Sequence, residues 1–339
     1  MAQNVDLGID FGTSSVVICD SENQVILHEP AVISIVRSNN RVLAVGDKAA
    51  KMIGRAPAEI QVIRPLQEIA TKSSTNLVIM AATILGHFVE KAIGKRHFGG
   101  PRVVLSVPSI VDERDRSQLL VALYEENIKR SQMLKRPTAA AIGAEMNIRE
   151  DIGQMIVDVG GGTTEIAVFA KGDLFTKESY NDAGDSFDKA IIDYIKRKYS
   201  TLIGEVTAED LKCNIASAVP RKKELSMEVV GRNLLTGLPK VLTINSSELY
   251  DAIEAPLQKF LECIYLALEK TPASLATDIL STGITLSGGG AKLFDISRAV
   301  EMAMNLPCRL VYNPEETVAR GCARALVNTK EFGQYLSSN

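Results

Sequence analysis

The sequence predicts an α/β protein built from two similar halves. One pattern occurs twice: an alternating apolar run, a short loop that begins with aspartate and is rich in glycine and hydroxyl residues, and a second apolar run. The loops are residues 10–15 (DFGTSS) and 158–164 (DVGGGTT). A mixture of strand and helix patterns follows each loop, as an α/β domain requires. We therefore expect a duplicated pair of domains that face each other across a cleft.

Both loops have the composition of phosphate-binding hairpin tips. Apolar alternation on each side of a loop predicts a strand, a tight turn and a second strand. Glycines and small hydroxyl residues at the tip leave backbone N–H groups close enough together to surround a phosphate. Asp10 and Asp158 would repel a bare phosphate, but they suit a phosphate that carries Mg²⁺. One such hairpin is usually an ordinary turn, and the repeat is what favours a nucleotide site.

The first half opens with a β-meander built on the first loop. The patterns that follow predict short strands at 31–36 and 41–45, a helix at 76–94, a buried strand at 103–108, a charged helix at 112–129 and an alanine-rich helix at 138–143.

The second half repeats this series from its own loop. A third glycine run, residues 288–290, differs because it lies between a strand and a helix, where it is either a tight turn or a backbone surface for a base or sugar. The predicted elements are a hairpin at 155–170, helices at 186–199, 248–268 and 318–327, a strand at 284–287, and a polar, basic inserted segment at 200–245.

Composition excludes several classes of protein. A chain of 339 residues with 46% hydrophobic residues is long enough to form two hydrophobic cores. Its net charge of −3 does not support binding to nucleic acid. The longest nearly continuous apolar run, residues 78–85, is far shorter than the roughly 20 residues that span a bilayer, and no signal peptide is expected. Five scattered cysteines favour buried, reduced thiols in the cytosol. The three histidines do not have the spacing of metal ligands, which gives no support to a metalloenzyme. The sequence motifs of P-loop ATPases and of dinucleotide-binding dehydrogenases are absent.

These motifs together make the chain resemble the actin and Hsp70 ATPase superfamily and, within it, the MreB family of bacterial actins. The two loops by themselves indicate the superfamily. Three further segments point to MreB, and a sugar kinase or an Hsp70 would share the loops without them. They are LIGE at 202–205, GRNL at 231–234 and VARG at 318–321.

The resemblance implies duplicated actin-like (ribonuclease H-like) domains, with four subdomains around a nucleotide cleft. Domain I would span residues 1–145 and 315–339, with an insertion at about 31–75. Domain II would span 146–314, with an insertion at about 182–247. It also implies linear, paired filaments that organise cell shape at the inner face of the membrane. The protein would then be cytoplasmic and peripheral, with itself and membrane-bound shape proteins as partners.

Residue by residue, the resemblance implies a site for ATP or ADP with Mg²⁺. Asp10 and Asp158 would hold Mg²⁺ through waters, and Thr164 would help to position the attacking water. The remaining positions would bind the β-phosphate (Thr13, Ser14 and Ser15), the γ-phosphate (Gly161, Gly162 and Thr163), and the ribose and base (Glu209, Lys212, Gly288, Gly289, Gly290 and Ala291).

The sequence departs from the family pattern at the catalytic step. The family carries paired acidic residues just before the Pro-x-Ala-Ala-Ala helix, and here the pair is Lys135 and Arg136. A guanidinium can stabilise phosphate charge, but it cannot accept a proton from water. ATP binding with slow hydrolysis is therefore expected, and enzymatic activity is left open. Phe98 occupies the place of the family's membrane-touching loop.

Two other classes of function compete with a filament-forming protein. A small-molecule kinase or phosphatase on the same fold would need a catalytic carboxylate, against which Lys135 and Arg136 argue. A chaperone-like ATPase module would need a substrate-binding domain, and the chain ends soon after the helix at 318–327. Sedimentation with ATP separates the filament hypothesis from the kinase or phosphatase hypothesis, since only a filament-forming protein assembles.

Overall fold

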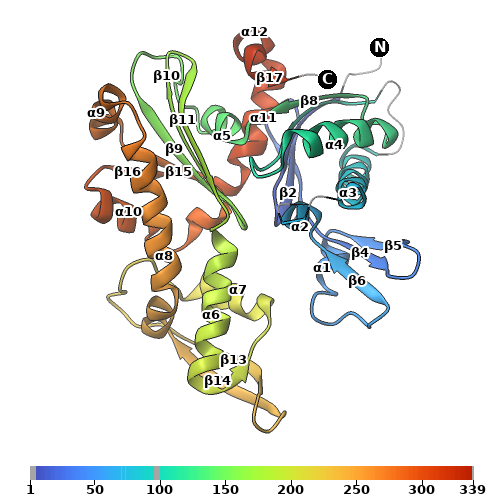
Figure 1. The fold of residues 1–339 in the computed structure, drawn as a ribbon, viewed down its shortest axis with the longest axis vertical. Helices are drawn as coiled ribbons and strands as arrows, with labels where there is room; N and C mark the ends of the chain where they lie inside the picture. The colour runs from blue at the N-terminus through green and yellow to red at the C-terminus, as the bar shows by residue number, and fades with distance from the viewer. Residues whose placement is uncertain (1–4, 70, 73, 95–99, 338–339) are drawn as a thin grey trace. The chain divides into compact units, whose positions relative to one another are not determined.

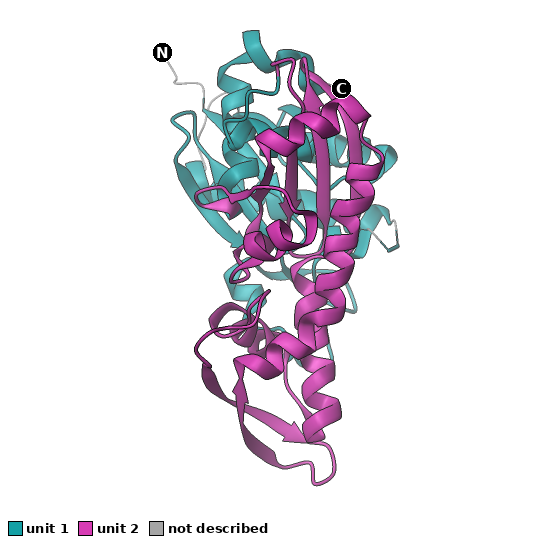
Figure 2. Ribbon diagram, turned by 90° about the vertical axis from the view of Figure 1, so that its left-hand side faces the viewer, with its two compact units in different colours: residues 1–148, 315–339 teal, residues 149–314 magenta. Residues whose placement is uncertain are grey.

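A computed structural model describes residues 5–69, 71–72, 74–94 and 100–337. The chain divides into two compact units (Figure 2). Unit 1 comprises residues 1–148 and 315–339, and unit 2 comprises residues 149–314. Each unit contains a mixed β-sheet and a hydrophobic core of its own.

The main sheet of unit 1 has six strands in the order β17-β8-β7-β1-β2-β3. Strands β17, β8 and β2 are labelled in Figure 1. The central strand β1 pairs antiparallel with β2 and parallel with β7, which confirms the first predicted hairpin. The strands are β1 (Asp6–Phe11), β2 (Ser15–Cys19), β3 (Val25–Pro30), β7 (Arg102–Ser106), β8 (Arg130–Leu134) and β17 (Leu336–Ser337).

A smaller three-stranded sheet, β5-β4-β6, also belongs to unit 1. Its strands and helix are β4 (Ile33–Val36), β5 (Val42–Val45), β6 (Ile60–Ile63) and α1 (Asp47–Ala50). The other helices of this unit are α2 (Pro65–Ile69), α3 (Thr75–Ile93), α4 (Glu113–Glu125), α5 (Arg136–Gly143), α11 (Thr317–Val327) and α12 (Thr329–Phe332).

The predicted charged helix is shorter in the structure than in the prediction. It was expected to reach residue 129, but α4 ends at Glu125 and the chain enters strand β8 at Arg130. Strand β8 was not predicted, because its five residues (RSQML) lack alternation and only the last two are buried.

Among the described residues, α3 alone is long and apolar enough to cross a membrane by length and composition. The helix extends beyond the apolar run at 78–85 on both sides, where polar residues interrupt the apolar sequence. Ile84, Leu85 and Phe88 are all at most 1% exposed and pack in the core of unit 1. Its apolar side is thus occupied as in a core helix of a globular domain.

The main sheet of unit 2 has five strands in the order β11-β10-β9-β15-β16. Strand β9 pairs antiparallel with β10 and parallel with β15, so the second predicted hairpin is also confirmed. The strands are β9 (Gln154–Val159), β10 (Thr164–Ala170), β11 (Asp173–Tyr180), β15 (Ile284–Ser287) and β16 (Cys308–Leu310).

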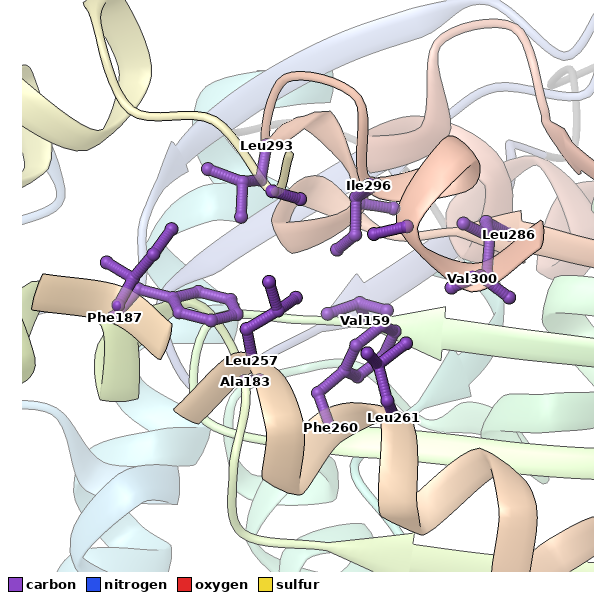
Figure 3. Packing of buried hydrophobic residues seen from close by; sticks show 14 of the residues in the cluster. Val159, Ala183, Phe187, Leu257, Phe260, Leu261, Leu286, Leu293, Ile296 and Val300 are labelled. Carbon is purple, nitrogen blue, oxygen red and sulfur yellow. The ribbon is translucent and has the colours of Figure 1, made fainter. Parts of the chain in front are cut away.

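The core of unit 2 lies between this sheet and its helices, and Phe187, Leu257, Phe260 and Val300 belong to this one cluster of buried side chains (Figure 3). The long helix α8 begins with a capping box formed by Asn245 and Glu248. The helices are α6 (Gly184–Tyr199), α7 (Glu205–Asn214), α8 (Ser246–Glu269), α9 (Ala273–Thr282) and α10 (Ile296–Met304), and the second sheet joins β12 (Thr201–Leu202), β13 (Ser226–Asn233) and β14 (Pro239–Asn245).

Glycines allow α11 to pack directly on α5 and β1. A Cβ atom on Gly143 would lie 1.8 Å from the carbonyl oxygen of Thr317, and one on Gly321 would lie 1.8 Å from that of Ala139. A Cβ atom on Gly8, in β1, would lie 2.1 Å from the backbone nitrogen of Ala323. No larger residue fits at these three positions, so this glycine seam holds α5 close to β1.

The cysteines agree only partly with the expectation of buried thiols. Cys19, Cys263 and Cys322 are buried, whereas Cys213 is exposed and Cys308 is half-buried. All five are free thiols. Burial raises the pKa of Cys19 to about 12 and that of Cys263 to about 11, so both remain protonated and unreactive at neutral pH.

Candidate nucleotide site

The two hairpin tips have the same turn geometry. In unit 1 the backbone N–H of Gly12 donates to the carbonyl of Ser15 at 2.9 Å, and in unit 2 that of Gly160 donates to Thr163 at 2.8 Å. A Cβ atom on either glycine would lie 3.1 Å from the carbonyl that closes its turn. A side chain at either position would make a tight contact, so both tips favour glycine at the same place, and the sequence repeat is also a structural repeat.

The residues assigned to the phosphates lie within this turn in each hairpin. Thr13 and Thr163 are buried, at 5% and 4% exposure. Their neighbours Ser14, Ser15, Gly161 and Gly162 are half-buried. The first tip thus presents partly accessible backbone and hydroxyl groups and the second partly accessible backbone, which fits a phosphate.

In unit 1, Arg136 and Asp10 form a buried ion pair next to the hairpin tip. Their side chains are 6% and 7% exposed. The guanidinium binds the carboxylate through two hydrogen bonds, Nη1 to Oδ1 and Nη2 to Oδ2, the second at 3.1 Å. Arg136 Nη1 also lies 3.9 Å from the place where a Cβ atom of Gly12 would be. The guanidinium is therefore held against the backbone of the tip.

Lys135, the other basic residue at this place, has a different environment. It precedes α5 and its side chain is exposed, whereas Arg136 is in the first turn of the helix. Only one of the two basic residues therefore changes the chemistry of the site.

Asp10 in this arrangement does not fit the predicted Mg²⁺ site. Both of its oxygens accept hydrogen bonds from Arg136, and the cationic group beside it would repel a metal ion. The described part of the chain also contains no group of three or more His, Cys, Asp or Glu residues that could hold a metal.

In unit 2, Asp158 and Thr164 occupy the two sides of the second tip. Asp158 is fully buried and accepts a hydrogen bond of 2.8 Å from the hydroxyl of Ser287, its neighbour in the register of β9 and β15. The Thr164 hydroxyl donates to the carbonyl of Asp182 at 2.6 Å. Because that proton is already used, Thr164 would act on a water as a hydrogen-bond acceptor.

The third glycine run packs on the second hairpin. Gly288 has a φ of +86°, and its Cβ atom would lie 2.2 Å from the carbonyl oxygen of Val159. A Cβ atom on Gly290 would lie 2.6 Å from the carbonyl oxygen of Gly160. Both positions require glycine for this close packing. Gly289 is exposed, Gly290 is half-buried, and Gly288 and Ala291 are buried.

Helix α6 and Lys212 also converge on the second tip. The N–H of Gly184 donates to the carbonyl of Gly160 at 3.2 Å, and Lys212 Nζ donates to the carbonyl of Gly184 at 3.2 Å. Glu209, on the same helix as Lys212, is exposed. The structure therefore gathers the second hairpin tip, the glycine run and Lys212 around one point of unit 2.

Asp188 is a member of this group that the sequence analysis did not select. Its Oδ2 accepts a hydrogen bond of 2.6 Å from Lys212, while its Oδ1 is buried without a hydrogen-bond partner. Burial raises the pKa of Asp188 to about 6, against the opposing charge of Lys212. The one signal in the sequence is its place in the segment GDSFD at 184–188, which also resembles the MreB family.

The family model described as MreB/Mbl protein matches residues 4–334. The chain belongs to the MreB/Mbl family. It is 36% identical over 325 residues to the cell shape-determining protein Mbl of Bacillus subtilis (strain 168), which covers 95% of this chain and 96% of that protein. It is also 36% identical over 326 residues to the cell shape-determining protein MreB of Escherichia coli (strain K12), covering 95% and 93%. The predicted family is confirmed.

Solved structures confirm the predicted actin-like fold. MreB 5 of Spiroplasma citri bound to AMPPNP matches with a TM-score of 0.89 and 30% identity, over 98% of each chain. The same protein bound to ADP matches with the same TM-score, over 98% of this chain and 99% of that one. A MamK double helical filament matches with a TM-score of 0.77 over 95% and 98%, and at 19% identity it supports the fold alone.

Proposed function

We propose that this MreB/Mbl family protein binds ATP or ADP and assembles into linear, paired filaments that take part in determining cell shape. The repeated hairpin turn at Gly12 and Gly160 carries the proposal, because each tip has the glycine geometry of a phosphate-binding turn. The full-length match to Mbl and MreB, which are named for cell shape, supports the cellular role. It does not favour the kinase, phosphatase or chaperone alternatives.

In this proposal the residues keep their predicted tasks, with one change. Thr13, Ser14 and Ser15 bind the β-phosphate, and Thr164 accepts a hydrogen bond from the attacking water. The bound nucleotide supplies the phosphoanhydride bond. Asp158 is the remaining candidate for contact with Mg²⁺, since Asp10 is engaged by Arg136. The other contacts are assigned to Gly161, Gly162 and Thr163 for the γ-phosphate, and to Glu209, Lys212, Gly288, Gly289, Gly290 and Ala291 for the ribose and base.

The location and the partners rest on the family. We place the protein in the cytoplasm at the inner face of the membrane, with membrane-bound shape proteins as partners. The proposed membrane contact at Phe98 lies outside the described residues.

Calorimetric titration with ATP and Mg²⁺ tests the nucleotide site. Asp158→Ala is expected to weaken binding by about 10- to 100-fold, because a buried charged group that meets the ligand is lost. Ser287→Ala is the matched control, since it removes the hydrogen bond to Asp158 but keeps the carboxylate. The assigned site is wrong if Asp158→Ala folds and binds ATP as tightly as the unmodified protein.

A further inference from the structure

The ion pair of Asp10 and Arg136 changes the charge at the first hairpin tip. An aspartate and a glutamate at these two positions, as the family pattern has them, would carry two negative charges. Here the two side chains sum to zero, and both are almost fully buried. A triphosphate that reaches this tip therefore does not meet the uncompensated carboxylates that a divalent cation would otherwise have to neutralise.

Arg136 is also held in place for contact with an anion. The bidentate pair with Asp10 fixes the plane of the guanidinium, and Nη1 lies beside the backbone of Gly12. A pre-oriented guanidinium loses little conformational entropy when an anion binds. It remains charged at every physiological pH, so its contribution does not titrate.

The glycine seam explains why the pair forms. Gly143 and Gly321 let α11 pack against α5, and Gly8 lets it pack against β1. Arg136 begins α5 and Asp10 lies near the end of β1, so the seam brings the two side chains together although 126 residues separate them in the sequence.

We propose that Arg136, oriented by Asp10, removes the carboxylate repulsion at the first hairpin tip and donates hydrogen bonds to the nucleotide bound there, two tasks that a divalent cation would otherwise perform. The protein consequently binds ATP with little dependence on Mg²⁺. This inference rests on the proposed nucleotide site. It is motivated by the finding that Asp10, paired with Arg136, does not fit the role of a metal ligand.

Calorimetric titration with ATP, once with excess Mg²⁺ and once with EDTA, tests the inference. The unmodified protein is expected to change its dissociation constant by less than about 3-fold between the two conditions. Arg136→Glu is expected to lose about 10- to 100-fold in EDTA, the size of one or two lost charged contacts. If the unmodified protein and Arg136→Glu lose affinity for ATP by the same factor in EDTA, the inference is wrong and the proposed function is unaffected. A lack of ATP binding by the unmodified protein in both conditions overturns both.

Two further variants keep the test valid if Arg136→Glu does not fold. Asp10→Asn with Arg136→Gln replaces the ion pair by a neutral pair of similar shape, and its fold is checked by circular dichroism. This double variant is expected to lose at least about 10-fold in EDTA, whereas Arg136→Lys, which keeps the charge, is expected to lose less. If the neutral pair binds ATP in EDTA as well as the unmodified protein does, the inference is wrong.

Discussion

At the scale of single residues, Arg136 stands where the resemblance to the family predicts an acidic residue. It is buried and paired with Asp10 rather than exposed to solvent. Breaking a buried ion pair by removing one partner is strongly destabilising, because a charge is left without compensation. Asp10 and Arg136 must therefore be considered as one unit, and a change at either affects both binding and folding.

Replacing Arg136 by glutamate should restore a water-polarising carboxylate. We expect the unmodified protein to hydrolyse ATP slowly, and Arg136→Glu to release phosphate about 10²- to 10⁴-fold faster, the usual range for a general base. Phosphate release at saturating ATP and Mg²⁺ measures the rate.

The control for this experiment is Lys135→Glu, which adds an acid at the exposed neighbouring position. It should leave the rate unchanged on its own. Combined with Arg136→Glu it removes the lysine that could pair with the new carboxylate. Fast hydrolysis by the unmodified protein, or an unchanged rate in a folded Arg136→Glu, would show that another group supplies the base.

Asp188 should make the stability of unit 2 depend on pH. Its pKa rises from 3.8 to about 6, so between these values the folded protein holds a proton that the unfolded chain has lost. The contribution of Asp188 to stability is therefore complete below about pH 4 and decreases as the pH rises through 6. Relative to Asp188→Asn, the unmodified protein should lose about 1–3 kcal/mol between pH 4 and pH 7. Urea denaturation of both proteins at the two pH values measures the difference, and a constant difference would contradict the raised pKa.

At the scale of elements, the packing of α11 on α5 and β1 depends on the absence of side chains at Gly8, Gly143 and Gly321. The backbones approach so closely that the position of α5 is determined by the seam. This matters for the nucleotide site, because α5 carries Arg136 in its first turn.

Adding one methyl group to this seam should separate the helices. Gly321→Ala would place a Cβ atom 1.8 Å from the carbonyl oxygen of Ala139. We expect a loss of about 2–3 kcal/mol in the free energy of unfolding, as for overpacked cores. Urea denaturation measures the loss. Gly333→Ala, also in unit 1, is the matched control, because its nearest neighbour in the space of the new Cβ is an atom of Thr329 at 3.9 Å. Equal stability of the two variants would show that the seam tolerates a side chain.

At the scale of the whole molecule, the proposed activity is assembly. Head-to-tail contacts that do not close into a ring produce filaments. Because the expected slow hydrolysis would keep the bound nucleotide as ATP, filaments formed with ATP should persist for as long as the nucleotide lasts.

Sedimentation and electron microscopy with ATP, ADP and no nucleotide, together with phosphate release from the same samples, measure assembly. We expect filaments with ATP that outlast those of Arg136→Glu. A protein that stays monomeric at high concentration, with ATP and Mg²⁺ and on a lipid surface, would contradict the proposed function.

Local patterns in the sequence determined most of the secondary structure. The alternation around residues 10–15 and 158–164 predicted both hairpins, since the side-chain period of a strand is a local property. Motifs in their order also predicted the family and the actin-like fold. Strand β8 was not predicted because its residues do not alternate between apolar and polar. Its place in the sheet depends on pairing with the distant strands β7 and β17.

Only the tertiary structure decided what the site residues do. The sequence showed that Arg136 replaces an acid, but not that it binds Asp10, because that pair joins residues 126 positions apart. The sequence likewise singled out residues 288–290 but could not show that Gly288 and Gly290 are required by contact with Val159 and Gly160. No sequence pattern indicated the role of Asp188, since its pKa is raised by burial, which the charge of Lys212 only partly offsets. Hydrogen-bond partners and burial are properties of the packed chain, and no local pattern in the sequence encodes them.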